Sequence, residues 1–174
     1  MNKLKNKDVR IDRLAVIKRP YLLSYGSHIS IDCFVYISCG VSLGDWVHIA
    51  PFVSIIGGER GRLTMGNFCA LASGARIICA TDDWLSSHVC SFIPAQYKHV
   101  INKPVIIKDF CGVATNGVVM PGVTMAMGSI LGVGSVLTEN TQEWGVYVGS
   151  PARLVKYREN KEILNSAKIL GYEI

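Results

Sequence analysis

An aliphatic residue recurs at every sixth position of the segment IDCFVYISCGVSLGDWVHIAPFVSI, residues 31–55. The recurring residues are Ile31, Ile37, Leu43, Ile49 and Ile55, and a second series is Val35, Val41, Val47 and Val53. A buried helix face recurs at three or four residues and a half-buried strand at two, so neither explains the interval. Each unit instead offers two inward positions, as a short strand followed by a sharp corner would.

The period continues along most of the chain, with two interruptions. It resumes at Met65, Leu71 and Ile77, and again at Ile107, Val113, Val119, Met125, Leu131 and Leu137. The first interruption is GGERGR, and the second is a polar and aromatic segment from about Ala80 to Pro104. Corner segments such as GDWVHI and MGNFCA contain Gly and Asn, which tolerate the positive φ that tight corners need. Three units per turn predict an all-β triangular prism whose faces are parallel sheets.

The length of 174 residues and a hydrophobic fraction of 49% indicate one domain, residues 1–174. We expect repeats over about 25–157, an external loop over 80–104 and a C-terminal helix over 158–171. That helix is predicted from NKEILNSAKILG, whose apolar residues lie on one face, and we expect it to cap or pack against the end of the prism. The segment before Tyr25 is expected to form the first strand or coil.

Composition excludes several classes of protein. No run approaches the ~18 apolar residues of a membrane span, and the basic start lacks the apolar segment of a signal peptide, so we expect a cytoplasmic protein. The six cysteines show no CxxC spacing, which favours buried thiols over disulfides or a zinc site. A net charge of +5 carried by scattered Lys and Arg favours a small anionic ligand over nucleic acid.

The repeat, together with KPVIIKDFCGVATNGVVMPGVTMAMGSILGVGSVLTEN and the ending VYVGSPARLVK, resembles the hexapeptide-repeat acyltransferases. The resemblance covers roughly residues 25–157. It implies a left-handed parallel β-helix, a homotrimer with active sites between subunits, and acyl transfer from coenzyme A. The ending and the long loop before KPV favour the sugar acetyltransferases of that family.

Four aromatic residues fall where side chains should point outward from the prism. They are Trp46, Phe52, Phe68 and Phe110. Exposed aromatic residues in this number are typical of an interface, which agrees with the trimer that the resemblance implies.

The resemblance implies acetyl-CoA as co-substrate, with its arm along small corner residues. The candidate contacts are Ala114, Thr115, Gly132, Val133 and Thr138, and Arg153 and Lys156 match basic residues near the nucleotide phosphates. Glu139 stands where relatives carry a lysine, so that one contact is not expected here. The alternatives are that the glycines serve corner geometry alone and that the two basic residues are solvated.

The catalytic base is expected from the resemblance and from the positions of the histidines. The Gly-His-Pro motif of some relatives is absent, and Asp82 and Asp83 fall in its place; ATDDWLSSH, with the upstream VHIA, is similar to a subgroup found in surface-polysaccharide synthesis. His48 follows an inward valine and should point outward, where Asp82 or Asp83 could orient it as general base. His88 and Trp84, in the same loop, are candidate acceptor contacts, and His88 is also an alternative base. The alternatives are that His48 is an ordinary surface histidine and that the aspartates cap loop N–H groups.

The predicted function is acetyl-CoA-dependent acetylation of a sugar or nucleotide-linked sugar by direct attack on the thioester. No metal is expected. A ping-pong route through Cys79 or Cys90 is disfavoured because neither has a basic neighbour in the sequence. A non-catalytic scaffold and a zinc hydratase of the same fold remain alternatives, and the sequence leaves open whether oxygen or nitrogen receives the acetyl group.

Overall fold

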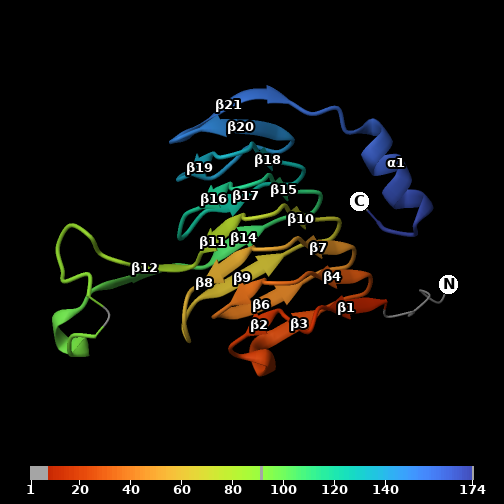
Figure 1. The fold of residues 1–174 in the computed structure, drawn as a ribbon. Helices are drawn as coiled ribbons and strands as arrows, with labels where there is room; N and C mark the ends of the chain where they lie inside the picture. The colour runs from red at the N-terminus through yellow and green to blue at the C-terminus, as the bar shows by residue number, and fades with distance from the viewer. Residues whose placement is uncertain (1–7, 91, 174) are drawn as a thin grey trace.

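The triangular prism predicted from the period is the architecture of the protein in a computed structural model, which describes residues 8–90 and 92–173 (Figure 1). Three sheets form its faces. Sheet A contains β1 (Val9–Ile11), β4 (Ile29–Ile31), β7 (Val47–Ile49), β10 (Ala70–Leu71), β15 (Gly112–Val113), β18 (Ile130–Leu131), β20 (Gly145–Gly149) and β21 (Ala152–Tyr157). Sheet B contains β2 (Val16–Ile17), β5 (Tyr36–Ile37), β8 (Ser54–Ile56), β11 (Arg76–Ile78), β16 (Val118–Val119) and β19 (Val136–Leu137). Sheet C contains β3 (Leu23–Tyr25), β6 (Gly40–Leu43), β9 (Arg62–Met65), β14 (Val105–Ile107) and β17 (Thr124–Met125).

The chain visits the three sheets in the order A, B, C and then begins the next turn. Leu23 pairs with Val41, an interval of 18 residues, whereas Val41 pairs with Leu63, an interval of 22 that includes the GGERGR insertion. Ala70 pairs with Gly112, an interval of 42, because the external loop lies between them. Both insertions therefore leave the stacking of the turns intact, and turns begin already at β1.

The inward residues of the period form one continuous core. Ile31, Ile37, Ile49, Ile55, Leu71, Ile77, Ile107, Met125, Leu131 and Leu137 are all at most 1% exposed, and the valine series between them is buried as well. Cys39, Cys69, Cys79 and Cys111 share this interior as free thiols, as predicted, while Cys33 is partly exposed and Cys90 is exposed. Burial of these aliphatic side chains is the main source of stability.

The corners between sheets C and A differ from the sequence prediction. In GDWVHI and MGNFCA the positive φ belongs to the aromatic residues Trp46 (60°) and Phe68 (56°) and not to the Gly or Asn. Glycine has this role only later in the chain, as at Gly128 (φ 72°). A left-handed conformation is unfavourable by roughly 1–2 kcal/mol for a residue with a Cβ, so other interactions must hold the aromatic corners.

Stacking of rings from turn to turn is one such interaction. His28, Trp46, Phe68, Phe110 and Trp144 form a column, the aromatic corner, with successive ring centroids 3.8, 6.2, 5.1 and 6.0 Å apart. Such aromatic pairs add about 0.5–1.5 kcal/mol each beyond burial, which offsets the backbone strain.

A ladder of side-chain hydrogen bonds is the second interaction. The Oδ1 atoms of Asp45, Asn67 and Asp109 each accept a backbone N–H from the turn before, from Ser27, Asp45 and Asn67, at 2.7–2.8 Å. A glycine precedes each of the three residues that donate these hydrogen bonds, because a Cβ on the glycine would collide with the accepting carboxyl or amide group. A Cβ added at Gly66 would lie only 2.0 Å from Asp109 Oδ1.

The C-terminal segment covers the aromatic corner instead of capping the prism. α1 (Lys161–Ile169) confirms the predicted helix, but it lies beside the stack of turns, and the end of the prism is closed by β20 and β21 (Figure 1). Tyr172 donates a hydrogen bond to Asp45 Oδ2 at 2.8 Å and packs edge-on against Phe68. Phe110, stacked between Phe68 and Trp144, is only 6% exposed, so the prediction that it is an exposed interface residue is wrong; Phe52, on another corner, is 62% exposed as predicted.

The external loop begins with β12 (Ala80–Asp82) and ends with β13 (Val100–Asn102), and these two strands pair in an antiparallel manner. It follows β11 and precedes β14, so it leaves the prism at the corner between sheets B and C and extends away from it (Figure 1). Short 3₁₀ turns occur at Pro20–Leu22 and Ala95–Tyr97. Among the described residues, no helix has the length and apolar character needed to cross a membrane.

The hydrogen-bond ladder predicts the effect of adding one methyl group. Gly66→Ala places a Cβ against both the carboxylate and the backbone N of Asp109, so we expect thermal unfolding roughly 5 °C or more lower than in the unchanged protein. Gly58→Ala is the control, because Gly58 has φ 59° but open space around it and should show only the smaller backbone effect. Equal melting temperatures for the Gly66 variant and the unchanged protein would contradict the ladder.

Candidate active site

His48 lies in the middle of β7 and points outward from sheet A, as predicted. Its neighbours Val47 and Ile49 point inward and are 1% and 0% exposed, which fixes the backbone on both sides of the imidazole. The imidazole is about half exposed, and its Nε2 lies 2.8 Å from Asp32 Oδ2. Within one chain, the carboxylate that contacts His48 is therefore Asp32, and an orienting role for Asp82 or Asp83 stays a prediction.

Asp32 is held in place from several sides. It follows β4 directly, and its backbone N–H donates to Ile49 O at 2.9 Å. The Ser30 hydroxyl donates to Oδ1 at 2.9 Å. The hydrogen bond from His48, and then that from Ser30, hold the pKa of the Asp32 carboxyl below its usual value against the opposing effect of partial burial. Asp32 is therefore ionised at neutral pH.

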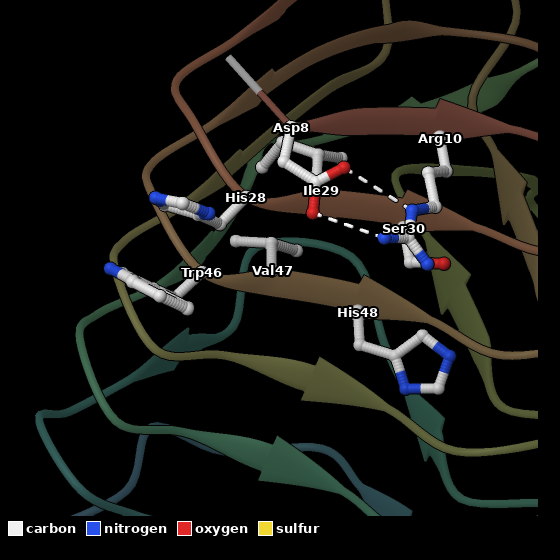
Figure 2. A pocket seen from close by; sticks show the side chains of 8 residues that line it. All are labelled: Asp8, Arg10, His28, Ile29, Ser30, Trp46, Val47 and His48. Carbon is white, nitrogen blue, oxygen red and sulfur yellow. Dashed lines mark hydrogen bonds and ion pairs between the residues drawn. The ribbon is translucent and has the colours of Figure 1, made fainter. Parts of the chain in front are cut away.

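A hollow of about 320 Å³ lies on sheet A beside this pair (Figure 2). Its lining includes Asp8, Arg10, Ser30, Trp46 and His48. Arg10 and Asp8 form an exposed ion pair at 3.2 Å, drawn in Figure 2. Since Arg10, Ser30 and His48 are opposite one another in adjacent strands, their side chains form one outward row.

The loop residues predicted for the site have different roles in the structure. The Asp83 carboxylate accepts hydrogen bonds from the backbone N–H groups of Leu85 (3.1 Å) and Ser86 (3.3 Å) and from the Ser86 hydroxyl. These bonds, that from the hydroxyl first, lower the pKa of Asp83. This is the capping role that the sequence analysis gave as the alternative. The Asp82 carboxylate, in contrast, accepts no hydrogen bond from any described residue.

Trp84 and His88 are exposed in the loop. The indole N–H of Trp84 donates to Thr81 Oγ1 at 3.2 Å, and the side chain is nevertheless 69% exposed. His88 is exposed near the far part of the same loop. Because the loop leaves the corner between sheets B and C, whereas His48 lies on sheet A, a single chain does not bring these residues together (Figure 1).

Four of the candidate coenzyme A contacts lie close together at the corner between sheets A and B, whereas Thr138 follows β19 of sheet B. Ala114 and Thr115 follow β15, and Gly132 and Val133 follow β18 one turn later; the Gly134 N–H donates to Thr115 O at 2.9 Å. Val133 is 73% exposed. A Cβ at Gly132 would lie 2.6 Å from Val148 in β20, so Gly132 also permits close packing of the last turn. The corner is an exposed ledge of small residues, as an extended thioester arm requires.

Arg153 and Lys156 share one outward face. Arg153 is opposite Val148 and Lys156 is opposite Val146, and these two valines are two residues apart on the same face of β20. The pairing is possible because the ladder between β20 and β21 is irregular near Val146. Arg153 also lies 3.8 Å from Glu139, which follows Thr138. The two cations are thus available together at the end of the prism, with one of them partly neutralised.

The described cysteines and acidic residues favour no other site. Within residues 8–90 and 92–173, no group of three His, Cys, Asp or Glu side chains is placed to hold a metal ion. Burial raises the pKa of the Cys111 thiol, and the hydrogen bond with Cys39, together with burial, raises that of Cys79. A buried thiol of raised pKa is a poor nucleophile, which argues against the ping-pong route through Cys79.

Asp32 is the residue that sequence reasoning missed. It precedes His48 by 16 residues, two fewer than one turn, so the 18-residue turn would have brought it beside His48. The sequence period alone does not reveal which of several outward residues forms the hydrogen bond.

No family model matches the chain. The chain is 31% identical to AntD, an N-acyltransferase from Bacillus cereus solved with dTDP and 3-hydroxybutyryl-CoA, with a TM-score of 0.90 over 95% of this chain and 88% of AntD. It is 32% identical to a variant of AntD solved with dTDP-4-amino-4,6-dideoxyglucose and coenzyme A, again with a TM-score of 0.90, over 95% and 89%. A curated relative, the dTDP-4-amino-4,6-dideoxy-D-glucose acyltransferase of Escherichia coli, is 27% identical over 143 residues, 80% of this chain and 73% of that protein.

The similarity to AntD extends over 95% of this chain. These similarities confirm the left-handed β-helix, and they favour an enzyme over a scaffold or a hydratase. With more than 30% identity over most of a protein of the same fold, the chain belongs to the hexapeptide-repeat acyltransferases.

Proposed function

We propose that this protein is a trimeric, acyl-CoA-dependent N-acyltransferase whose acceptor is an amino sugar linked to a nucleotide. The observation that carries the proposal is the similarity to AntD, whose structures contain coenzyme A and a dTDP-amino sugar, over nearly the whole chain. Nitrogen is preferred over oxygen as the acceptor because both the solved and the curated relatives reported above act on, or are bound to, an amino sugar.

The proposed reaction is direct transfer. The neutral amine attacks the thioester carbonyl carbon, the C–N bond forms, and the C–S bond breaks as the tetrahedral intermediate collapses. His48 takes the proton that the amine loses and returns a proton to the departing thiolate, so coenzyme A leaves as the free thiol. No covalent enzyme intermediate is needed, which agrees with the burial of Cys79.

The active site is proposed to form between subunits. The loop that carries Asp82 leads away from its own His48, and its apolar side chains are unusually exposed: Leu85 is 98% and Phe92 97% exposed. Apolar residues on an extended hairpin favour packing on a second copy of the chain. We assign Asp82, whose carboxylate accepts no hydrogen bond within the described chain, to the acceptor bound at His48 of the neighbouring subunit, with Trp84 and His88 beside it.

Arg153 and Lys156 are proposed to bind the phosphates of coenzyme A. The arm would then follow the ledge made by Ala114, Thr115 and Val133. Thr138 is assigned to the same end through its neighbour Glu139, which already contacts Arg153.

We place the enzyme in the cytoplasm and in the synthesis of a surface polysaccharide. The cysteines are all free, which suits a reducing compartment, and nucleotide-linked amino sugars are donors for glycosyl transfer.

The proposed function predicts the acceptor's chemistry. Mixing the protein with acetyl-CoA and dTDP-4-amino-4,6-dideoxyglucose should release free thiol at a rate that a thiol reagent detects, and mass spectrometry should find an amide. dTDP-6-deoxyglucose, which has a hydroxyl group in place of the 4-amine and is otherwise the same sugar, is the matched control and should give little turnover. Turnover of the hydroxylated sugar alone would mean that the enzyme is an O-acyltransferase.

The phosphate contacts predict a change in binding and not in chemistry. Replacing both Arg153 and Lys156 with Ala should raise the KM for acetyl-CoA by roughly tenfold with kcat nearly unchanged, since contacts shared by ground and transition states are uniform binding. S-acetyl-pantetheine lacks the nucleotide phosphates and should be used equally by both proteins. An unchanged KM for acetyl-CoA would show that the two residues are solvated.

The shared active site predicts complementation between inactive chains. His48→Ala should lower kcat by roughly a hundredfold or more, since general-base catalysis contributes about 10²–10⁴-fold, and Asp82→Ala should also be impaired. Trimers assembled from equal amounts of the two variants should regain about a quarter of normal activity, because a quarter of the interfaces combine an intact His48 with an intact Asp82.

Each variant alone, mixed with itself, is the control for that experiment. Light scattering should find a trimer in every sample. A monomer, or no recovery in the mixed sample while each variant remains folded, would contradict a site shared between subunits.

A further inference from the structure

The hydrogen bond between His48 and Asp32 has a directional consequence. An ionised carboxylate can only accept hydrogen bonds, and Asp32 is ionised because its pKa is lowered by the groups around it. In the 2.8 Å contact, Nε2 must then be the donor. A neutral imidazole carries one proton, so Nδ1 is left with the free electron pair.

We propose that Asp32 is a positioning residue that fixes His48 in the Nε2–H tautomer, so that Nδ1 is the atom that accepts the proton of the acceptor amine. This inference rests on the proposed function, in which His48 is the base. Asp32 itself touches neither the thioester nor the amine.

The surroundings of the imidazole support this assignment. Within the described chain no group forms a hydrogen bond with Nδ1, so it is available to a substrate. On the β10 side the opposite residue is Ala70, which carries no charge. On the β1 side Arg10 is already paired with Asp8, and His28 stacks on Trp46 at a centroid distance of 3.8 Å. Asp32 is therefore the charged group that determines the orientation of His48.

The backbone makes the pair rigid. The Asp32 N–H donates a hydrogen bond to Ile49 O, and Ile49 follows His48 directly. This backbone hydrogen bond therefore fixes the carboxylate relative to the imidazole. Ser30, opposite His48 in the next strand, occupies the second carboxylate oxygen at 2.9 Å. Rotation of the carboxylate would break one of these bonds.

The first test is spectroscopic. Nitrogen NMR of the imidazoles, recorded in alkaline buffer where they are neutral, should show His48 in the unchanged protein mainly as the Nε2–H tautomer. In Asp32→Asn the amide can donate or accept, so the two tautomers should become mixed. A dominant Nδ1–H tautomer in the unchanged protein would overturn the inference whatever the activity.

The second test is kinetic. Asp32→Asn should lower kcat by about tenfold or more while the KM for acetyl-CoA changes by less than about twofold, and Asp32→Glu should restore part of the loss. Asp12→Asn is the matched control: the Asp12 N–H donates to Ile31 O as the Asp32 N–H does to Ile49 O, but its carboxylate caps the Leu14 N–H at 2.8 Å. That control should retain normal kcat.

Stability measurements exclude a merely structural loss. The pKa of Asp32 is lowered on folding, so its contribution to stability is present at neutral pH and lost as pH falls through the folded pKa, below about 4. The melting temperatures of Asp32→Asn and the unchanged protein should therefore converge in acid, and both should be folded at the pH of assay.

The failure of this inference is distinguishable from failure of the proposed function. If the unchanged protein acylates the amino sugar and His48→Ala is inactive, normal kcat in Asp32→Asn overturns the positioning role alone. If His48→Ala is fully active, the base lies elsewhere and the inference fails while acyl transfer stands. If the unchanged protein does not transfer acyl groups to any amino sugar, the proposed function fails first.

Discussion

Backbone hydrogen bonds between successive turns determine the positions of the side chains on the three sheets of the prism. The Asp32 N–H bonds to Ile49 O at 2.9 Å and the His48 N–H to Cys69 O at 3.1 Å, and the same connection repeats around the prism. A slip of one residue would turn an inward aliphatic side chain to the outside. The register is therefore fixed by the core, and each outward residue has one defined neighbour above it and one below.

This constraint explains why function is found at corners and on outward rows. Additional residues are tolerated only between strands, where GGERGR and the external hairpin occur without disturbing the pairing on either side. Because each outward residue has a fixed neighbour in the next turn, similar side chains of successive turns can stack and so stabilise a strained backbone conformation. Each left-handed aromatic residue of the corner stacks on the next, and Tyr172 of the C-terminal segment closes over Phe68.

The sequence predicted the features that depend on the period and missed those that depend on side-chain direction. Ile31, Ile49 and Leu131 were predicted to be inward because their spacing admits one fold. The aromatic residues at positive φ were not predicted, since the preference of Gly and Asn for that conformation is the stronger local signal and only stacking across turns overrides it. Asp32 was missed because the length of a turn shows which outward residues lie near His48 but not which of them forms a hydrogen bond with it.

The outward row of sheet A connects the two ends of the proposed site. His48, Ala70, Gly112, Ile130, Val146 and Lys156 are opposite one another in successive strands. Five strand spacings of about 4.8 Å separate His48 from Lys156, roughly 24 Å, so a carrier bound by its phosphates at one end must be extended to reach the other. The two residues that follow His48 in this row are Ala70, whose side chain is a methyl group, and Gly112, which has no side chain. Ala70 is exposed. No bulky side chain of the chain's own row therefore covers the imidazole on the side from which the proposed thioester would arrive.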